Sequence, residues 1–242
     1  MTMKTTSITL GLIFMLIAGF SQAAGLTSES IARSQDYEKT IDVKDFSKLD
    51  ITIACELYLR QGGEESMRIE ADKDILDRLE IEVRDSTLYI ETMRDHDFDD
   101  WDVEVYLTVK QLKSIDIGGA VKLRTNGTLK GERLELDISG AADLEMRIEV
   151  DKLLADFGGA VNAELEGKAR YVVMDMSGAS RVEADDLITD AFYLEFSGFG
   201  KAEVYAGKVL KVDMSGMGVV RYGGNPEKVK TSSSGLGIIK AR

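Results

Sequence analysis

The sequence predicts an all-β fold, a parallel β-helix in which coils of about 19 residues stack on one another. Three observations support this prediction. A five-residue pattern recurs at a nearly constant period, apolar and polar residues alternate on both sides of it, and the same class of side chain returns at the same offset in each copy. A regular period of this length indicates stacked copies of one structural unit.

The recurring pattern reads DISGA at residues 137–141, and its fourth position is glycine in every copy. These glycines are Gly119, Gly140, Gly159, Gly178, Gly198, Gly216 and Gly235. Their successive spacings are 21, 19, 19, 20, 18 and 19 residues. Nineteen residues are too few for a strand and a long helix, so each copy is interpreted as strand, corner and strand. We expect the glycines at the corners, where the backbone bends sharply or approaches the neighbouring coil.

An unbroken apolar column stands two positions before the corner glycine. It consists of Ile117, Ile138, Phe157, Met176, Phe196 and Met214. A solenoid needs such a column, because each coil can bury its inner side chains only against its neighbours. An antiparallel sandwich would also show alternating strands, but would not need the same side-chain class at each offset. We therefore expect this column to form a continuous interior stack.

The first 23 residues predict a signal peptide. Lys4 precedes an apolar run over residues 8–20, and small residues occupy positions 21 and 23. We expect cleavage between Ala23 and Ala24, and hence an exported protein. The run is shorter than the ~20 residues that span a bilayer, so an integral membrane protein is not expected. Residues 24–40 are interpreted as a polar leader, and residues 41–242 as one β-helix domain whose regular repeats occupy 112–242.

The chain carries a net charge of −13 at pH 7. Phosphate and anionic lipid are bound through positive charge, so nucleic acid and anionic membranes are disfavoured as partners. Cationic partners, divalent ions and neutral sugars remain open. Cys55 is the single cysteine, which excludes an intramolecular disulfide, and we expect it to be buried as a small apolar residue.

Between residues 41 and 110 the alternation continues but the repeat becomes irregular. Residues 49–59 resemble a divergent coil with its corner at Ala54 and Cys55. A turn is expected at residues 84–86, between two short strands. A solenoid needs an atypical first unit to cover the open end of its stack, and this region suits that role.

Five segments in this order resemble a known family: FSKLDI at 46–51, LYLRQG at 57–62, LYIE at 88–91, VYLTV at 105–109 and LKSIDIGGA at 112–120. The family is the "putative auto-transporter adhesin, head GIN domain" family, and the resemblance covers about residues 45–225. It implies an exported, single-domain, right-handed β-helix. The family has no catalytic motif to transfer to this chain.

A column of carboxylates stands three positions before the corner glycine. Asp116 begins it, and the candidate cation ladder that follows is Asp137, Asp156, Asp175, Glu195 and Asp213. Strands in a sheet lie ~4.8 Å apart, so these groups would repel one another or recruit a cation such as Ca²⁺. The alternative is a solvated acidic face that prevents sideways aggregation. No cofactor and no metal ligand are assigned.

The segment 95–102 is crowded with aspartates, as in a calcium loop, but lacks the glycine and the final acidic residue of the EF-hand pattern. His96 is the single histidine, which excludes a catalytic triad or a multi-histidine metal site. Asn126-Gly127 is expected to form a tight turn rather than a glycosylation site.

Enzymes built on β-helices form their clefts from long loops inserted between coils. The constant repeat spacing leaves only the segments 60–66 and 93–102 as candidates for a site. The sequence therefore predicts a non-catalytic protein of the periplasm or cell surface. It would act as an adhesion or binding module toward an envelope protein or polysaccharide. The alternative is a carbohydrate-active or carbohydrate-binding β-helix protein of the envelope. Oligomeric state is open.

Overall fold

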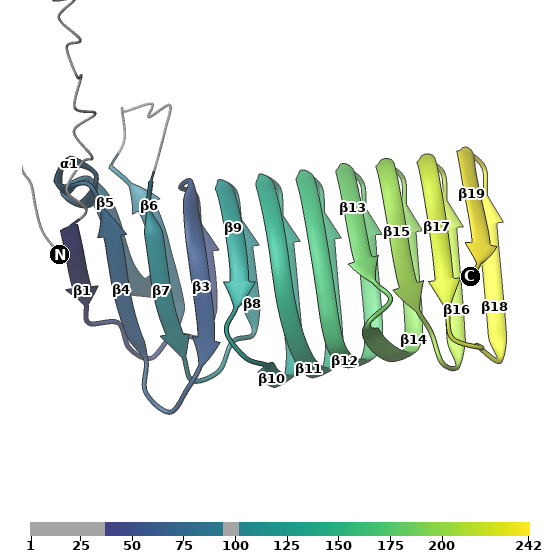
Figure 1. The fold of residues 1–242 in the computed structure, drawn as a ribbon, viewed down its shortest axis with the longest axis horizontal. Helices are drawn as coiled ribbons and strands as arrows, with labels where there is room; N and C mark the ends of the chain where they lie inside the picture. The colour runs from purple at the N-terminus through teal and green to yellow at the C-terminus, as the bar shows by residue number, and fades with distance from the viewer. Residues whose placement is uncertain (1–36, 94–101) are drawn as a thin grey trace, which may run out of the picture. The chain divides into compact units, whose positions relative to one another are not determined.

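The computed structural model describes residues 37–93 and 102–242, which form a β-solenoid of about seven turns (Figure 1). The signal peptide, its cleavage site at Ala23 and most of the expected leader lie outside the described residues. The same holds for residues 95–101 of the acidic segment, including His96. Within the described part, no helix is both long and apolar enough to cross a bilayer.

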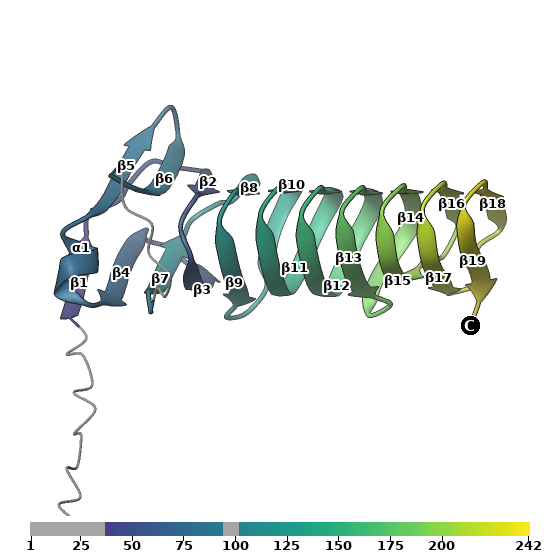
Figure 2. The ribbon, with the colours of Figure 1, turned by 90° about the horizontal axis from the view of Figure 1, so that it is seen from above.

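The regular coils are stacked in parallel, each strand hydrogen-bonded to the equivalent strand of the next coil (Figures 1 and 2). Their strands are β8 (Ser114–Ile117), β9 (Ala120–Thr125), β10 (Leu129–Ile138), β11 (Ala141–Phe157), β12 (Ala160–Met176), β13 (Ala179–Ala184), β14 (Leu187–Phe196), β15 (Phe199–Tyr205), β16 (Val209–Met214), β17 (Met217–Gly223), β18 (Lys228–Ser233) and β19 (Leu236–Ala241). The predicted fold class is confirmed.

The interior stack is also confirmed. Ile138, Phe157 and Met176 are 0% exposed, Phe196 is 1% exposed and Met214 is 2% exposed. The strand register places these five side chains on successive coils. Each inner side chain is therefore covered by the coil below it and the coil above it, as the repeat requires.

The corner glycines sit where coils touch. A Cβ atom built on Gly159 would lie 1.8 Å from the carbonyl oxygen of Gly140, and one on Gly140 would lie 2.1 Å from the carbonyl oxygen of Gly119. Close approach, and not a left-handed backbone, explains these glycines. Positive φ occurs instead at other glycines, including Gly127 in the expected Asn-Gly turn.

The N-terminal coils are stacked in an order that differs from their order in the sequence. Strands β2 (Lys48–Ile51) and β3 (Cys55–Gln61) form the divergent coil. On one side they pair with β8 and β9, and on the other with β6 (Thr87–Thr92) and β7 (Glu104–Val109). The first coil thus lies between two coils that follow it in the chain. The hydrophobic pattern predicts the coil but not which neighbours it has.

Antiparallel strands surround the outermost coil. β4 (Ser66–Ala71) pairs with β7 and with β1 (Tyr37–Ile41), while β5 (Leu79–Arg84) pairs with β6 after the short helix α1 (Lys73–Leu76). The atypical first unit therefore breaks the parallel pattern, which blocks further parallel stacking at this end. Strand β1 includes the last four residues of the segment expected to be a leader.

The expected turn between β5 and β6 is present, with Asp85 and Ser86 at φ of 48° and 61°. Cys55 is 6% exposed, as expected. Its burial raises the pKa of the thiol to about 12, so the thiolate is not formed at neutral pH. Cys55 is therefore a packing residue of the hydrophobic core.

Candidate binding surfaces

The acidic ladder lies in register on the outside of the solenoid. Asp116, Asp137, Asp156, Asp175, Glu195 and Asp213 occupy equivalent positions on successive strands. Each is exposed or half-buried, and each is flanked by buried apolar residues. The structure adds Asp50, which pairs in register with Asp116. Sequence reasoning missed Asp50 because its coil had no assigned place in the stack.

The pKa values of some carboxylates in this row are raised by partial burial and by the like charges next to them. Partial burial, then the charge of Asp156 and Glu195, raises the pKa of Asp175. Burial and a neighbouring aspartate likewise raise the pKa of Asp50 and of Asp116. At the far end, Lys211 lies 2.5 Å from Asp213 and balances its charge. Among the described residues no three metal-binding side chains converge on one point, and cation binding stays a prediction.

A second group of charged residues is centred on Glu203, which forms ion pairs with three basic side chains. Glu203 on β15 is 6% exposed and receives hydrogen bonds from Lys201 and Arg221, which lower the pKa of its carboxyl to about 2. Arg242 also reaches Glu203, at 2.6 Å. This carboxylate thus joins β15, β17 and the last residue of the described chain. Its role is structural.

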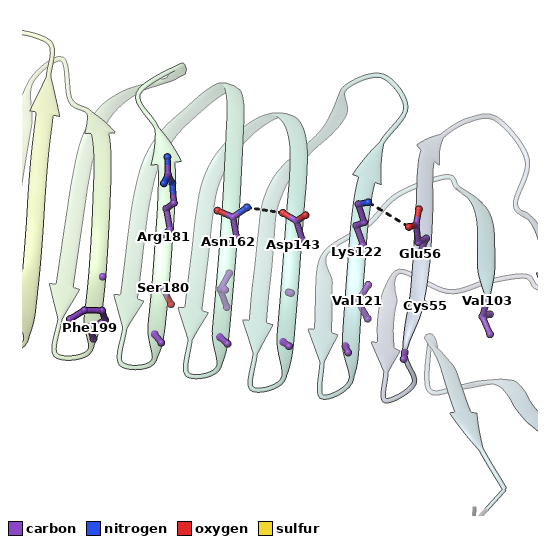
Figure 3. Close-up of a pocket in the computed structure, with 18 of the residues that line it drawn as sticks. Cys55, Glu56, Val103, Val121, Lys122, Asp143, Asn162, Ser180, Arg181 and Phe199 are labelled. Atoms are coloured by element: carbon purple, nitrogen blue, oxygen red, sulfur yellow. Dashed lines mark hydrogen bonds and ion pairs between the residues drawn. The ribbon is translucent and has the colours of Figure 1, made fainter. Parts of the chain in front are cut away.

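A shallow groove of about 780 Å³ follows the corners of the coils (Figure 3). Its floor is made of small residues, among them Ala120, Ala141, Ala160 and Ala179. One margin carries the polar series Lys122, Asp143, Asn162 and Arg181. Phe199 lies at the end where the small residues stop. The groove is therefore apolar along its floor and polar along one edge.

The floor of the groove continues beyond Phe199 as an exposed apolar row. We name this row the corner column. It is Ala120, Ala141, Ala160, Ala179, Phe199, Met217 and Leu236, one residue from each regular coil, in register. All seven residues are exposed, and Phe199 and Leu236 reach 63% and 78%. In the described part of the chain, the other outward positions beside it carry mostly polar or charged residues.

Sequence reasoning missed the corner column as a surface. The residue after each corner glycine was interpreted only as part of a tight bend. Aligning the seven copies shows that this position is apolar in all of them, and that it changes from alanine to large side chains at Phe199. An outward column without one polar residue is the signal that identifies it.

The segment 60–66 is one of the two segments expected to carry a site. Contacts of Glu65 connect it to neighbouring parts of the solenoid. Glu65 pairs with Lys110 at 3.1 Å and accepts a hydrogen bond from the Asp45 backbone N–H. Its side chain is only 4% exposed. Of the other expected segment, Asp102 is described, and it lines the groove at the end away from Phe199.

The chain belongs to the family described as "putative auto-transporter adhesin, head GIN domain", whose model matches residues 45–226. Solved structures share its fold. A putative adhesin from Bacteroides fragilis is 22% identical, with a TM-score of 0.83, over 86% of this chain and 97% of that one. A putative adhesin from Parabacteroides distasonis is 20% identical, with a TM-score of 0.67, over 87% and 98%.

A third structure, named a putative lipid binding protein from Parabacteroides distasonis, is 18% identical, with a TM-score of 0.67, over 87% of this chain and 98% of that one. At these identities the likeness establishes the fold alone. No curated protein matches the sequence. The family match and the shared fold thus confirm the predicted family and fold class.

Proposed function

We propose that this protein is an exported, non-catalytic binding module of the cell envelope or cell surface, and that the corner column is its contact surface. The observation that carries this proposal is the column itself: seven exposed apolar residues in register on a strongly acidic protein. Contiguous exposed apolar patches on soluble proteins mark interaction sites, because water is removed favourably from them on contact. Membership of an adhesin-named family supports the same function.

The partner is an envelope protein or polysaccharide that can cover an exposed apolar row bordered by charged and polar side chains. A test compares the adhesion of beads coated with the protein to intact cells or to envelope fractions. The double variant Phe199→Ser, Leu236→Ser should lose most of the adhesion, because the two most exposed large residues of the column are removed. The matched control is Val173→Ser, Ile188→Ser, which alters side chains of 43% and 47% exposure elsewhere. Equal adhesion of the two double variants would contradict the proposal.

Carbohydrate binding is a second candidate function. It is favoured by one observation, a pair of stacked tyrosines, Tyr58 and Tyr106, beside a polar hollow near the N-terminal end of the solenoid. Carbohydrate-active chemistry has no comparable support in the described residues.

A further inference from the structure

We infer that a hollow beside Arg60 binds a sugar unit that carries a carboxylate. The hollow measures about 370 Å³, within the range of small-ligand sites. It is formed on the outer face of strands β1, β4, β7 and β3, at the start of the 60–66 segment. This inference rests on the carbohydrate-binding candidate above and names its ligand class.

The composition of the hollow is unusual for this protein. It is lined by Arg60 and Arg68, by Tyr58 and Tyr106, and by the polar residues Thr40, Ser66, Thr108 and Asn126, with Met67 and Leu107. None of the described aspartates and glutamates lines it, although the full chain has 43 acidic residues. Each of the other four described hollows is lined by at least two carboxylates. The charge of this hollow therefore favours an anion.

Arg60 is the group available to that anion. Its guanidinium donates to the Thr108 hydroxyl at 3.2 Å and has no carboxylate partner among the described residues. Nine other described arginines are paired with carboxylates: Arg68, Arg84, Arg124, Arg133, Arg147, Arg170, Arg181, Arg221 and Arg242. A guanidinium recognises a carboxylate through two parallel hydrogen bonds, which makes this the matching ligand group.

The nearby acidic residues are held on the other side of the tyrosine pair. The hydroxyl of Tyr58 donates to Glu56 at 2.9 Å, and that of Tyr106 donates to Glu104. Arg68 lies 3.9 Å from the centre of the Tyr106 ring and pairs with Glu38 at 3.3 Å. The strand register places the two rings, whose centres are 4.9 Å apart, between Arg60 on one side and Glu56 and Glu104 on the other. A bound carboxylate is thereby shielded from direct contact with them.

Hydrogen bonds hold the residues on either side of Arg60, Leu59 and Gln61. The Asn126 backbone N–H donates to the Leu59 carbonyl at 2.8 Å, which holds the exposed Asn126 side chain next to Arg60. Gln61 bonds the backbone of Lys110 and of Lys130. Preorganised groups bind with a smaller entropy cost. Hydroxyl and amide groups around one arginine suit a sugar, which offers several hydroxyls beside its carboxylate, better than a simple anion.

The test measures the affinity of the full exported chain for methyl glucuronide by titration calorimetry or ligand-detected NMR. Methyl glucoside has the same ring without the carboxylate, and acetate has the carboxylate without the ring. We expect methyl glucuronide to bind at least tenfold more tightly than either. Arg60→Gln should weaken it at least tenfold, and Arg60→Lys should give an intermediate loss, because the charge stays but the two parallel bonds are lost.

Arg170→Gln is the matched control, since it removes the same charge from another hollow and should leave the affinity unchanged. Thermal unfolding of each variant checks that the fold is intact. The inference is overturned if glucuronide does not bind, if glucoside or acetate binds equally well, if inorganic sulfate competes as strongly as glucuronide, or if Arg60→Gln binds like the parent. Adhesion through the corner column is measured separately, so either proposal can fail without the other.

Discussion

The two adjacent glycines of one corner, Gly158 and Gly159, differ in whether they have room for an added methyl group. A Cβ on Gly159 would meet the Gly140 carbonyl oxygen at 1.8 Å, whereas the nearest atom to a Cβ on Gly158 is the Ser177 hydroxyl at 3.8 Å. Gly159→Ala should therefore destabilise the fold by about 2–4 kcal/mol through forced separation of two coils. Gly158→Ala should change stability by about 0.5 kcal/mol or less. Chemical denaturation of both variants measures the difference, and similar midpoints would show that the corner is not a contact.

Corner and core residues could be predicted from the sequence because the repeat shows each of them many times. Gly159 and Phe157 have the same role as their equivalents in neighbouring coils, so the pattern defines it. Arg60 could not be found this way. Its importance comes from the absence of described carboxylates around it, and that depends on the pairing of β3 with β7, which is distant in sequence.

At the level of the strands, the inner and outer faces of the solenoid distinguish two phenylalanines that lie two coils apart. Phe157 on β11 is 0% exposed, and Phe199 on β15 is 63% exposed. Phe157→Ala should leave a cavity between coils and cost about 3–5 kcal/mol. Phe199→Ala, the matched control, should cost about 1 kcal/mol or less, since little burial is lost. Urea unfolding monitored by circular dichroism tests both, and equal losses would contradict the assignment of inner and outer faces.

The ion-pair network at Glu203 links stability to acidity. The folded pKa of about 2 lies below the usual value of 4.5, so the ionised form is favoured by folding. The stabilisation is fully present above pH 4.5 and is lost as the pH falls toward 2. Glu203→Gln should lower stability at pH 7 by about 1–3 kcal/mol, as hydrogen bonds to a charged group are lost.

The same variant should lose less stability than the parent between pH 4.5 and 2. The melting temperature of both proteins across this range checks the linkage. A constant difference between them from pH 7 to 2 would show that Glu203 is not the titrating group.

For the whole molecule, the sequence predicts the solenoid but not the order of its first coils. Every regular coil after that of β8 and β9 pairs with the coils next to it in sequence, which is why a period of about 19 residues sufficed. The coil of β2 and β3 instead pairs with β6 and β7 and with β8 and β9, and its side chains fit either neighbour. Period-2 alternation records which face is buried, and carries no information on stacking order.

The acidic ladder extends from Asp50 to Asp213, and the repulsion between its carboxylates is a property of the whole row. Burial and the charges of Asp156 and Glu195 raise the folded pKa of Asp175 above 3.8. The destabilisation is therefore present above the folded pKa and relieved as the pH falls toward 3.8. Asp175→Asn should stabilise the protein at pH 7 by about 0.2–1 kcal/mol, the size of a cross-strand charge pair, and this gain should vanish near pH 3. Asp186→Asn, at an exposed turn, is the control and should give no such gain.

Calcium decides between the two interpretations of this ladder. A cation that binds only the folded chain raises the melting temperature by mass action. If the row binds calcium, the parent should melt higher in millimolar calcium. The double variant Asp156→Asn, Asp175→Asn should not, because the two central carboxylates are gone. Without calcium the double variant should be at least as stable as the parent, since repulsion is removed from the middle of the row. An unchanged melting temperature of the parent would leave the row as a solvated acidic face, whose repulsion keeps the side of the solenoid from pairing with other sheets.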